Sequence, residues 1–305
     1  MTTRTPTAPV DPAAQLSRWR ASRPSFDWVG LLPFFAFIAV FLIFPSLAIV
    51  VRSVTDETGA LTLNNLTGLL NPTIALAYRS SLLVSLLTAL SGGLIGGLLA
   101  WAVTLGGLPH WARSSVLSFS GVAANFAGIP LVFAFTALLG RLGFLNQFLR
   151  PIGAALDPQI YLFSFTGLCI VYTYFQIPLM VLIMTPALEG LRREWREAAE
   201  NLGATQTQYW RYVALPILAP AILGSMALLF ANAFSAYATA QALLGAMGQN
   251  FAVTIVVSNQ FRTDTFGDLG LGYSLAFSMM VVIAVTVMMY TYSRRRAERW
   301  LRRTE

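Results

Sequence analysis

The stretch EAAENLGATQTQYWRYVALP, Glu197–Pro216, is the most polar part of the second half of the chain and lies between two long apolar runs. The residues around its beginning, Leu188–Leu202, are rich in Glu, Arg, Leu and Ala, which all favour a helix. Gly203 follows, and glycine adopts the left-handed conformation that ends many helices. Thr205 and Gln208 then have the spacing of a capping box. The stretch therefore predicts a helix, a tight turn and a second helix.

Two further features of the stretch concern its surroundings. Pro216 supplies no amide hydrogen, so it predicts a turn or kink where the next apolar run begins. Ala198 and Ala199 have small side chains, which give a partner close access to the first helix.

The composition of the chain indicates an integral membrane protein. Of its 305 residues, 56% are hydrophobic and 11% are charged, whereas a water-soluble domain carries about 25% charged residues. The charges cluster and leave apolar runs of about twenty residues, the length that crosses a bilayer. The hydropathy predicts one all-α domain with six transmembrane helices: Trp28–Val51, Ser81–Leu105, Val116–Leu139, Tyr161–Ala187, Ile217–Leu244 and Leu271–Tyr292.

Flanking segments complete the predicted organisation. We expect a cytoplasmic N-terminal tail at 1–27, a six-helix membrane domain at 28–292 that contains the polar loop 188–216, and a basic cytoplasmic tail at 293–305. The basic tail is typical of a topology determinant that contacts lipid headgroups, so the net charge of +7 does not indicate nucleic-acid binding.

The arginines predict the orientation. All 20 basic residues are Arg, and the six spans place 15 of them on one side, which includes both termini and the polar loop, and 5 on the other. Positive residues favour the cytoplasm. Both termini and the loop are therefore expected inside the cell.

Polar side chains within the apolar runs are the candidates for a solute path. An unpaired amide in hydrocarbon costs several kcal/mol at the order-of-magnitude level, so these groups should face the protein interior. The alternative is plain hydrogen bonding between helices, which is worth about 0.6 kcal/mol per contact. The path candidates on the third to fifth spans are Asn125, Tyr172, Gln176, Asn232, Ser235 and Thr239.

Glycine and proline predict how the spans pack. Gly92, Gly93, Gly96 and Gly97 give two overlapping Gly-xxx-Gly spacings, which let a neighbouring helix approach closely. The prolines Pro130, Pro178 and Pro220 lie within the third, fourth and fifth spans, and each is expected to kink its helix.

Several functions are disfavoured by what the sequence lacks. It has no Lys, which a phosphate-binding P-loop requires, so ATP would have to be bound by another subunit. His110 is the one histidine and Cys169 the one cysteine, so we expect no catalytic site and no metal site. None of the six runs holds a charged group well inside it, which argues against an ion-coupled secondary carrier.

The polar loop resembles the EAA signature of binding-protein-dependent ABC importers. The signature is Glu-Ala-Ala, a glycine four positions after the second alanine, and then Ile-x-Leu-Pro. Glu197-Ala198-Ala199, Gly203 and Val213-Ala214-Leu215-Pro216 follow it, with Val213 where the family usually has Ile. An ordinary amphipathic loop is the alternative interpretation.

The resemblance implies a fold, partners and site residues. The fold is that of a type I ABC importer permease in a bacterial inner membrane, with two permease subunits, identical or homologous, that form the path. A dimer of cytosolic ATPase subunits uses ATP and Mg, an extracytoplasmic solute-binding protein delivers substrate, and this chain binds no cofactor itself. The residues implied to couple to the ATPase are Glu197, Ala198, Ala199, Gly203, Ala204, Leu215 and Pro216.

The substrate and two other classes of function stay open at this point. Similar permeases carry polyamines, ferric iron, thiamine, sulfate or aminophosphonates, and we favour a small organic solute such as a polyamine. The alternatives are a secondary carrier, which would need no ATPase, and a membrane-embedded enzyme, for which the sequence offers neither paired intramembrane carboxylates nor a suitable histidine. Copurification with an ATP-hydrolysing subunit separates the importer from both.

Overall fold

The computed structural model describes residues 30–56, 58–152, 157, 161–248, 250–261 and 268–301, with the backbone alone at 152, 246, 247 and 293–301. The chain divides into two compact units, Met1–Ile49 and Val50–Glu305. The described residues form helices throughout, with one isolated β-bridge between Thr55 and Leu61. The predicted tail at 1–27 lies outside the described residues.

The described residues of the first unit, 30–49, belong to one apolar helical run. Its elements are α2 (Leu32–Ile38), the π-helix η2 (Ala39–Ile43) and α3 (Phe44–Ser53), the last of which continues into the second unit. None of the side chains of α2 and η2 is buried. Leu32–Ser53 is long and apolar enough to cross a membrane, as predicted for Trp28–Val51.

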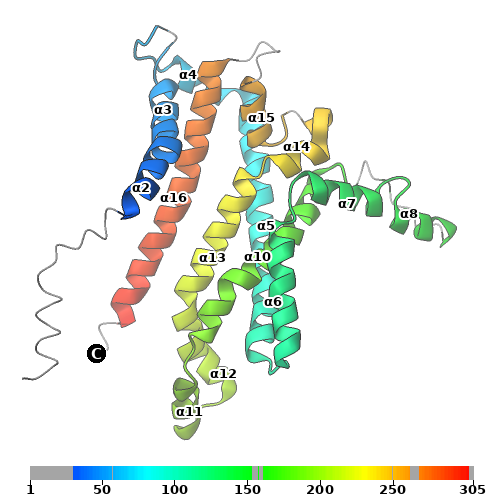
Figure 1. The fold of residues 1–305 in the computed structure, drawn as a ribbon, viewed down its shortest axis with the longest axis vertical. Helices are drawn as coiled ribbons and strands as arrows, with labels where there is room; N and C mark the ends of the chain where they lie inside the picture. Colours follow the sequence, from blue (N-terminus) through cyan, green and yellow to red (C-terminus); the bar gives the residue numbers. More distant parts are fainter. Residues whose placement is uncertain are drawn as a thin grey trace, which may run out of the picture. The chain divides into compact units, whose positions relative to one another are not determined.

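Three long helices form the centre of the second unit. They are α5 (Pro72–Leu105), α10 (Phe165–Glu189) and α13 (Leu215–Ser235), which run side by side (Figure 1). At 1.5 Å per residue the 34-residue α5 is about 51 Å long. It is therefore longer than the roughly 30 Å hydrocarbon core and extends into the headgroup layer.

The predicted glycine packing is found at the contact of α5 with its neighbours. A Cβ added to Gly92 would lie 2.4 Å from Cβ of Gln176, and one added to Gly96 would lie 2.5 Å from the Ile177 carbonyl oxygen on α10. Gly93 faces Met226 of α13. Because lipid tails are as apolar as a helix surface, close packing of small residues is what holds such helices together.

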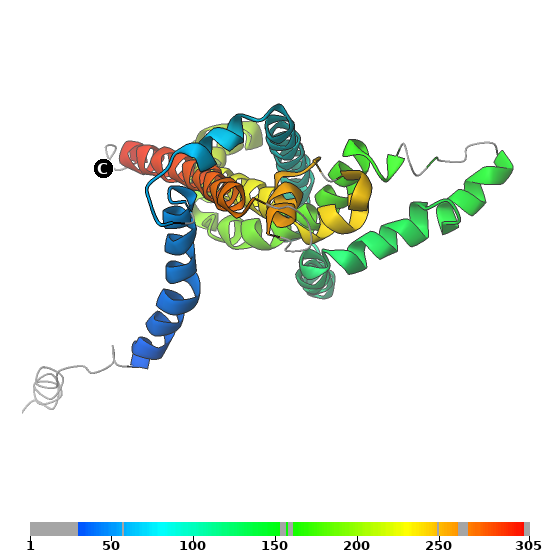
Figure 2. The same cartoon turned by 90° about the horizontal axis from the view of Figure 1, so that it is seen from above.

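The third predicted span is wrong as a single helix. Residues 110–139 form α6 (His110–Asn125) and α7 (Ile129–Leu139), separated by a break at which Gly128 has φ +72°. Pro130 therefore lies in the first turn of α7 rather than inside a kinked helix. Figures 1 and 2 show α7 running away from the bundle at a wide angle to α6.

The fifth predicted span is also interrupted. α13 ends at Ser235 instead of continuing to Leu244, and a separate helix, α14 (Ala238–Leu244), follows. Thr239 therefore belongs to α14 and not to the helix that carries Asn232. Pro178 and Pro220 do lie inside α10 and α13, as predicted.

Shorter elements and the last long helix surround this centre. The remaining elements of the second unit are α4 (Asn64–Thr67), η3 (Gly68–Leu70), α8 (Phe144–Leu149), η4 (Arg150–Ile152), α11 (Arg193–Asn201), α12 (Gln206–Tyr209), the π-helix η5 (Trp210–Ala214), η6 (Gly245–Gly248), α15 (Val253–Gln260) and α16 (Leu269–Leu301). α11 and α12 lie at one end of the bundle and α14 and α15 toward the other (Figure 1).

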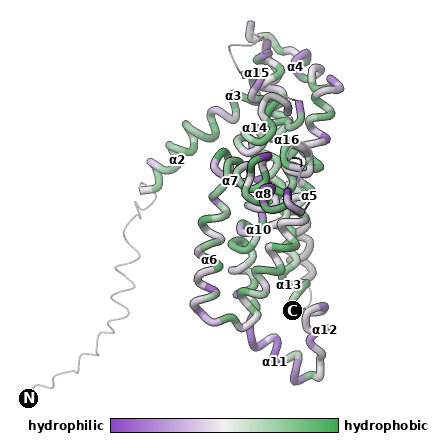
Figure 3. Tube along the Cα trace, turned by 90° about the vertical axis from the view of Figure 1, so that its right-hand side faces the viewer, coloured by the Kyte–Doolittle hydropathy of each residue, from purple (hydrophilic) through white to green (hydrophobic). Residues whose placement is uncertain are grey.

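Six helical stretches are long and apolar enough to cross a membrane. They are Leu32–Ser53, Pro72–Leu105, Ile129–Leu149, Phe165–Glu189, Gln206–Ser235 and Leu269–Tyr292. Coloured by hydropathy, the long helices are mainly hydrophobic and hydrophilic residues gather at α11 and α12 (Figure 3). The structure thus confirms an all-α protein with six candidate membrane helices, while it moves the third and fifth of them along the chain.

Candidate functional site

The polar loop folds as the predicted helix, turn and helix. α11 covers Arg193–Asn201, and Gly190–Arg192 separate it from the end of α10, so the first helix is shorter than the predicted Leu188–Leu202. α12 begins after Thr205. The Thr205 side chain accepts a hydrogen bond from the backbone amide of Gln208, and the Gln208 side chain accepts one from the backbone amide of Thr205. The capping box therefore satisfies amides that the start of a helix leaves unpaired.

The turn between the two helices depends on Gly203. It has φ +78°, in the left-handed region, and its amide donates to the Glu200 carbonyl at 2.9 Å. The amide of Ala204 donates to the Ala199 carbonyl at 3.0 Å. These two hydrogen bonds provide partners for carbonyl groups at the end of α11, as in other helices that end at a glycine. The turn is therefore set by backbone bonds that a residue with a side chain would strain.

The coupling candidates lie on both sides of this turn. Glu197 is inside α11 and pairs with Arg193 one turn earlier, with Nε and Oε1 3.0 Å apart, so it does not cap the helix. Ala198 is exposed, whereas Ala199 and Ala204 are half-buried. Leu202, next to the turn, leaves 88% of its surface exposed.

The second helix continues directly into a membrane span. α12, η5 and α13 form an unbroken helical run from Gln206 to Ser235, with Pro216 in the first turn of α13. Where a turn or kink was predicted at Pro216, the helix continues, with a short stretch of π-helix over Trp210–Ala214 just before it. Leu215 and Pro216 are exposed on this run. A displacement of the loop would thus be passed to α13 through a continuous helix.

An ion pair joins α6 and α10 at the end of the bundle that carries the polar loop. Arg113 near the start of α6 pairs with Glu189, the last residue of α10. Glu189 directly precedes the segment that leads into α11. The pair therefore links the polar loop to α6, the helix that leads to the break at Gly128.

Three of the predicted path residues are buried and hold the helix breaks in place. The Tyr172 hydroxyl donates to the Ala236 carbonyl at 2.7 Å, just beyond the end of α13. Thr239 Oγ1 accepts from the Gly128 amide at 2.9 Å and so joins the two breaks. Gln176, fully buried, donates to the Leu229 carbonyl at 2.7 Å. These side chains satisfy backbone groups or fix helix contacts in the way that interrupted membrane helices require.

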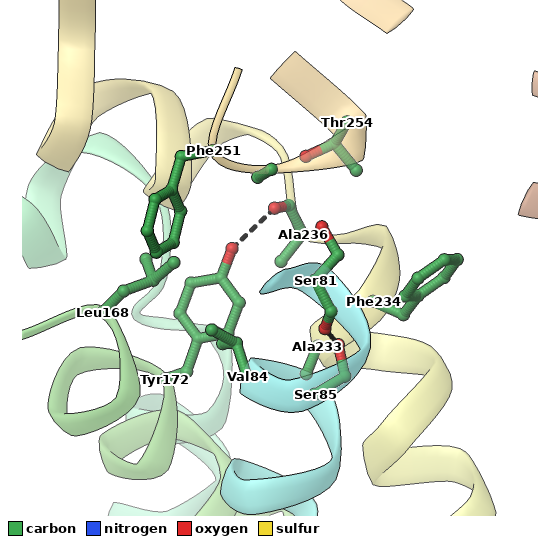
Figure 4. A pocket seen from close by; sticks show the side chains of 11 residues that line it. Ser81, Val84, Ser85, Leu168, Tyr172, Ala233, Phe234, Ala236, Phe251 and Thr254 are labelled. Carbon is green, nitrogen blue, oxygen red and sulfur yellow. Dashed lines mark hydrogen bonds between the residues drawn. The ribbon is translucent and has the colours of Figure 1, made fainter. Parts of the chain in front are cut away.

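A small pocket lies beside the Tyr172 hydrogen bond (Figure 4). Its walls come from α5, α10, the end of α13 and the start of α15, and hydroxyl groups of Ser81, Ser85 and Thr254 line it together with apolar side chains. The Ser81 hydroxyl accepts a hydrogen bond from the Val253 amide at 2.8 Å, so it caps the start of α15. The pocket therefore marks the joint between the central helices and α15.

The other three predicted path residues are exposed. Asn125 is the last residue of α6, and its side-chain amide donates to the Gly121 carbonyl at 2.8 Å. Asn232 and Ser235 lie on the last turn of α13, where the Asn232 amide is 3.5 Å from Oε1 of Gln176. The structure thus gathers Tyr172, Gln176, Asn232 and Ser235 around the end of α13, and Thr239 next to Gly128.

Sequence reasoning missed the two helix breaks. A glycine followed two residues later by proline, Gly128 and Pro130, is a signal for a break and a new helix start, and it was present. It also missed Tyr78, which donates to the Leu275 carbonyl and bonds with Ser278 of α16. The described residues contain no cluster of His, Cys, Asp or Glu that would hold a metal ion.

With this geometry in place, comparison with known proteins decides the family. The family model for the binding-protein-dependent transport system inner membrane component matches residues 20–299. This chain belongs to that family. It is a permease subunit of an ABC importer and a multi-pass inner-membrane protein.

Relatives within the family show how far the similarity extends. The chain is 30% identical over 184 residues to the sulfate transport system permease protein CysT of Salmonella typhimurium, which covers 60% of this chain and 64% of CysT, just under two thirds. It is 25% identical over 259 residues to the spermidine/putrescine transport system permease protein PotB of Escherichia coli, which covers 83% of this chain and 92% of PotB.

Solved structures agree on the fold. A bacterial ABC transporter involved in the import of the acidic polysaccharide alginate matches with a TM-score of 0.69 at 16% identity, over 93% of this chain and 98% of that chain. A bacterial alginate ABC transporter in complex with an alginate pentasaccharide-bound periplasmic protein matches with a TM-score of 0.70 at 16% identity, over 93% of this chain and 96% of that chain. At this identity the match establishes the permease fold and not the substrate.

Proposed function

We propose that this permease carries a small organic cation of the polyamine class and is driven by ATP that a partner subunit hydrolyses. The observation that carries the substrate class is the similarity to PotB, which extends over 83% of this chain and 92% of PotB. The similarity to CysT covers a smaller part of both chains.

The path runs past the exposed polar residues Asn125, Asn232 and Ser235. Asn125 and Asn232 each donate one hydrogen bond within the bundle, but an exposed amide has further donor and acceptor sites that lipid would leave without partners. This supports a position of both residues on an aqueous path or against a second permease subunit, identical or homologous, and Ser235 lies beside Asn232 on the last turn of α13. Tyr172, Gln176 and Thr239 do not line the path. They hold the helices that form it in place, through hydrogen bonds to the backbone of Ala236, Leu229 and Gly128.

The polar loop couples the path to a cytosolic ATPase dimer. We assign this role to Glu197–Ala204 with Leu215 and Pro216, because the capped turn is rigid, its tip is exposed and it leads without interruption into α13. The excess of arginine on this side of the spans supports a cytoplasmic position for the loop and both termini. The chain has no lysine for a P-loop, so ATP and Mg belong to the partner. A solute-binding protein docks on the opposite face.

Sulfate is a second candidate, favoured by the higher identity to CysT. The two substrates have opposite charge, so one experiment separates them. The permease is reconstituted with its cognate ATPase and binding protein, and ATP hydrolysis is measured with spermidine, putrescine or sulfate.

Stimulation by spermidine or putrescine and not by sulfate supports the proposal, and stimulation by sulfate alone replaces it with the second candidate. If neither stimulates, thermal-shift screening of the binding protein against small cations and anions identifies the class directly. A ligand outside the polyamines would overturn the proposed substrate while leaving the permease assignment intact.

A further inference from the structure

A pocket lies where the central bundle meets the polar loop. Trp101 and Leu105, at the end of α5, form part of its wall, and Trp210 of η5 lies beside Trp101, with ring centroids 6.1 Å apart in an edge-to-face arrangement. These residues lie at the ends of two membrane spans. Tryptophan is enriched at this depth, where one side of the ring meets the acyl chains and the other meets water.

The lining of the same pocket also carries positive charge. Arg192, Arg193 and Arg196, at the start of α11, all line it. α11 also carries three glutamates, but none of them lines the pocket. The loop therefore turns its positive side toward the pocket and the bundle end.

The arginines keep donors for a ligand. Arg193 and Arg196 pair with Glu197 and Glu200 through the Nε atom, at 3.0 and 2.8 Å. The guanidinium of Arg192 lies over the ring of Trp195, 5.7 Å from its centroid. A guanidinium presents five N–H donors in a planar fork that fits phosphate oxygens. Nε pairing thus leaves the terminal amino groups as the donors suited to an anion.

We propose that this pocket binds the phosphodiester headgroup of an anionic phospholipid from the adjacent leaflet. The arginines contact the phosphate, and the acyl chains lie along Trp101 and Leu105 at the end of α5. A lipid accounts for both the apolar and the positive part of the lining, whereas a free phosphate would use the arginines alone. The bound lipid holds α11 against α5 and so fixes the angle at which the polar loop is presented. This inference depends on the membrane spans and not on the proposed substrate.

The test is native mass spectrometry of the full-length permease from bilayers of equal parts phosphatidylglycerol and phosphatidylcholine. The pocket variant carries Arg192→Gln, Arg193→Gln and Arg196→Gln. The matched control carries Arg79→Gln, Arg141→Gln and Arg150→Gln, which removes the same charge from exposed or loop positions outside the pocket. Because one arginine near a membrane surface contributes roughly fivefold to the binding of an anionic lipid, we expect the loss of three to lower the phosphatidylglycerol preference of the pocket variant by roughly a hundredfold.

The outcomes decide between the sources of the anion. A control that retains the preference to within about twofold, together with the loss in the pocket variant, supports the proposal. Equal loss in both triple variants, or none in the pocket variant, overturns it. Inorganic phosphate and glycerol phosphate are added as competitors, and displacement of the lipid by either at millimolar concentration would show a soluble-phosphate site instead.

A second variant guards against misfolding of the triple substitution. Arg192→Gln alone leaves both ion pairs of α11 in place. It should weaken phosphatidylglycerol retention by roughly fivefold, the share of one surface arginine. Arg192→Lys keeps the charge and should restore most of it. An unchanged lipid preference in Arg192→Gln with normal thermal unfolding counts against the proposal.

Discussion

The Tyr172 hydroxyl on α10 donates a 2.7 Å hydrogen bond to the carbonyl of Ala236, the residue just after the end of α13. Tyr172 is itself buried, with 3% of its surface exposed. A helix that ends inside a membrane leaves carbonyl groups without partners, and no water is at hand to replace them. One side chain of α10 therefore stabilises the point at which α13 stops and α14 begins.

Removing this hydroxyl should loosen the break. We expect Tyr172→Phe to lower the stability of the permease by about 1–3 kcal/mol, the cost of leaving a buried carbonyl unpaired. The measurement is thermal unfolding in detergent or nanodiscs. Tyr174→Phe, on the same helix and half-buried against Phe135, is the matched control. Equal melting temperatures for the two variants would show that the bond to Ala236 does not hold the break.

The path residues should separate into two kinds when each is replaced by Leu. Gln176→Leu removes a bond to the Leu229 carbonyl from a fully buried position, so it should lower both assembly and transport. Asn125→Leu and Asn232→Leu change exposed side chains, and they should lower transport while the assembled complex is recovered in normal amounts. Uptake by proteoliposomes, normalised to complex recovered, makes the comparison. Normal transport by both asparagine variants would place the path elsewhere.

The sequence predicted the features that depend on residues close together in the chain, and it missed those that depend on distant residues. The capping box of Thr205 and Gln208 and the left-handed Gly203 join residues only a few positions apart, so their spacing in the sequence was enough. The apolar runs were found because bilayer thickness fixes their length. The EAA-like spacing around Gly203 pointed to the family that the comparisons then confirmed.

Hydropathy missed both helix breaks, although Gly128 and Pro130 carry a local signal for the first of them, because the bonds that hold the breaks join distant residues. The Gly128 amide is satisfied by Thr239, which is 111 residues further along the chain. Hydropathy does not distinguish a continuous span from two helices that meet at such a bond. For the same reason, the predicted span Ile217–Leu244 placed Thr239 on one helix with Asn232, although the break at Ala236 moves it to another helix.

Two glycines on α5 offer a test of the helix packing. A Cβ at Gly92 would lie 2.4 Å from Cβ of Gln176, whereas one at Gly97 would meet only the end of Met180, at 3.6 Å. We expect Gly92→Ala to destabilise the permease by about 1–3 kcal/mol through overpacking. Gly97→Ala should be close to neutral. Thermal unfolding of the two variants side by side checks this, and the reverse order would mean that α5 and α10 are not in the contact described.

The distribution of arginine predicts where the termini lie. With 15 arginines on the side of both termini and 5 on the other, a reporter fused after Glu305 should be active in the cytoplasm. Paired fusions of a cytoplasmic and a periplasmic reporter measure this, with a fusion at Gly59, between the first two spans, as the opposite control. Periplasmic activity after Glu305 would place the polar loop on the side that a cytosolic ATPase does not reach.

The turn at Gly203 gives the most direct test of the coupling role. Its φ of +78° is left-handed, and a Cβ built there has no neighbour within 4 Å, so a side chain would meet strain and not a clash. That strain is about 1–2 kcal/mol for an ordinary residue, and Asn tolerates the conformation better than a β-branched residue does. Gly203→Val should therefore re-aim α11 against α12 and abolish the stimulation of ATP hydrolysis by loaded binding protein, while Gly203→Asn retains much of it.

The readout is the ATPase rate of the reconstituted transporter with and without loaded binding protein. Gly190→Ala, next to the same loop but with φ −70°, is the control and should be stimulated normally. Binding of the loaded protein to the outer face should persist in Gly203→Val, because the loop lies at the other end of the spans from that face. If the Gly203→Val transporter is stimulated as fully as the Gly190→Ala one, the orientation of α11 does not carry the coupling, and the role proposed for Glu197–Ala204 is lost even though the chain remains a permease by family.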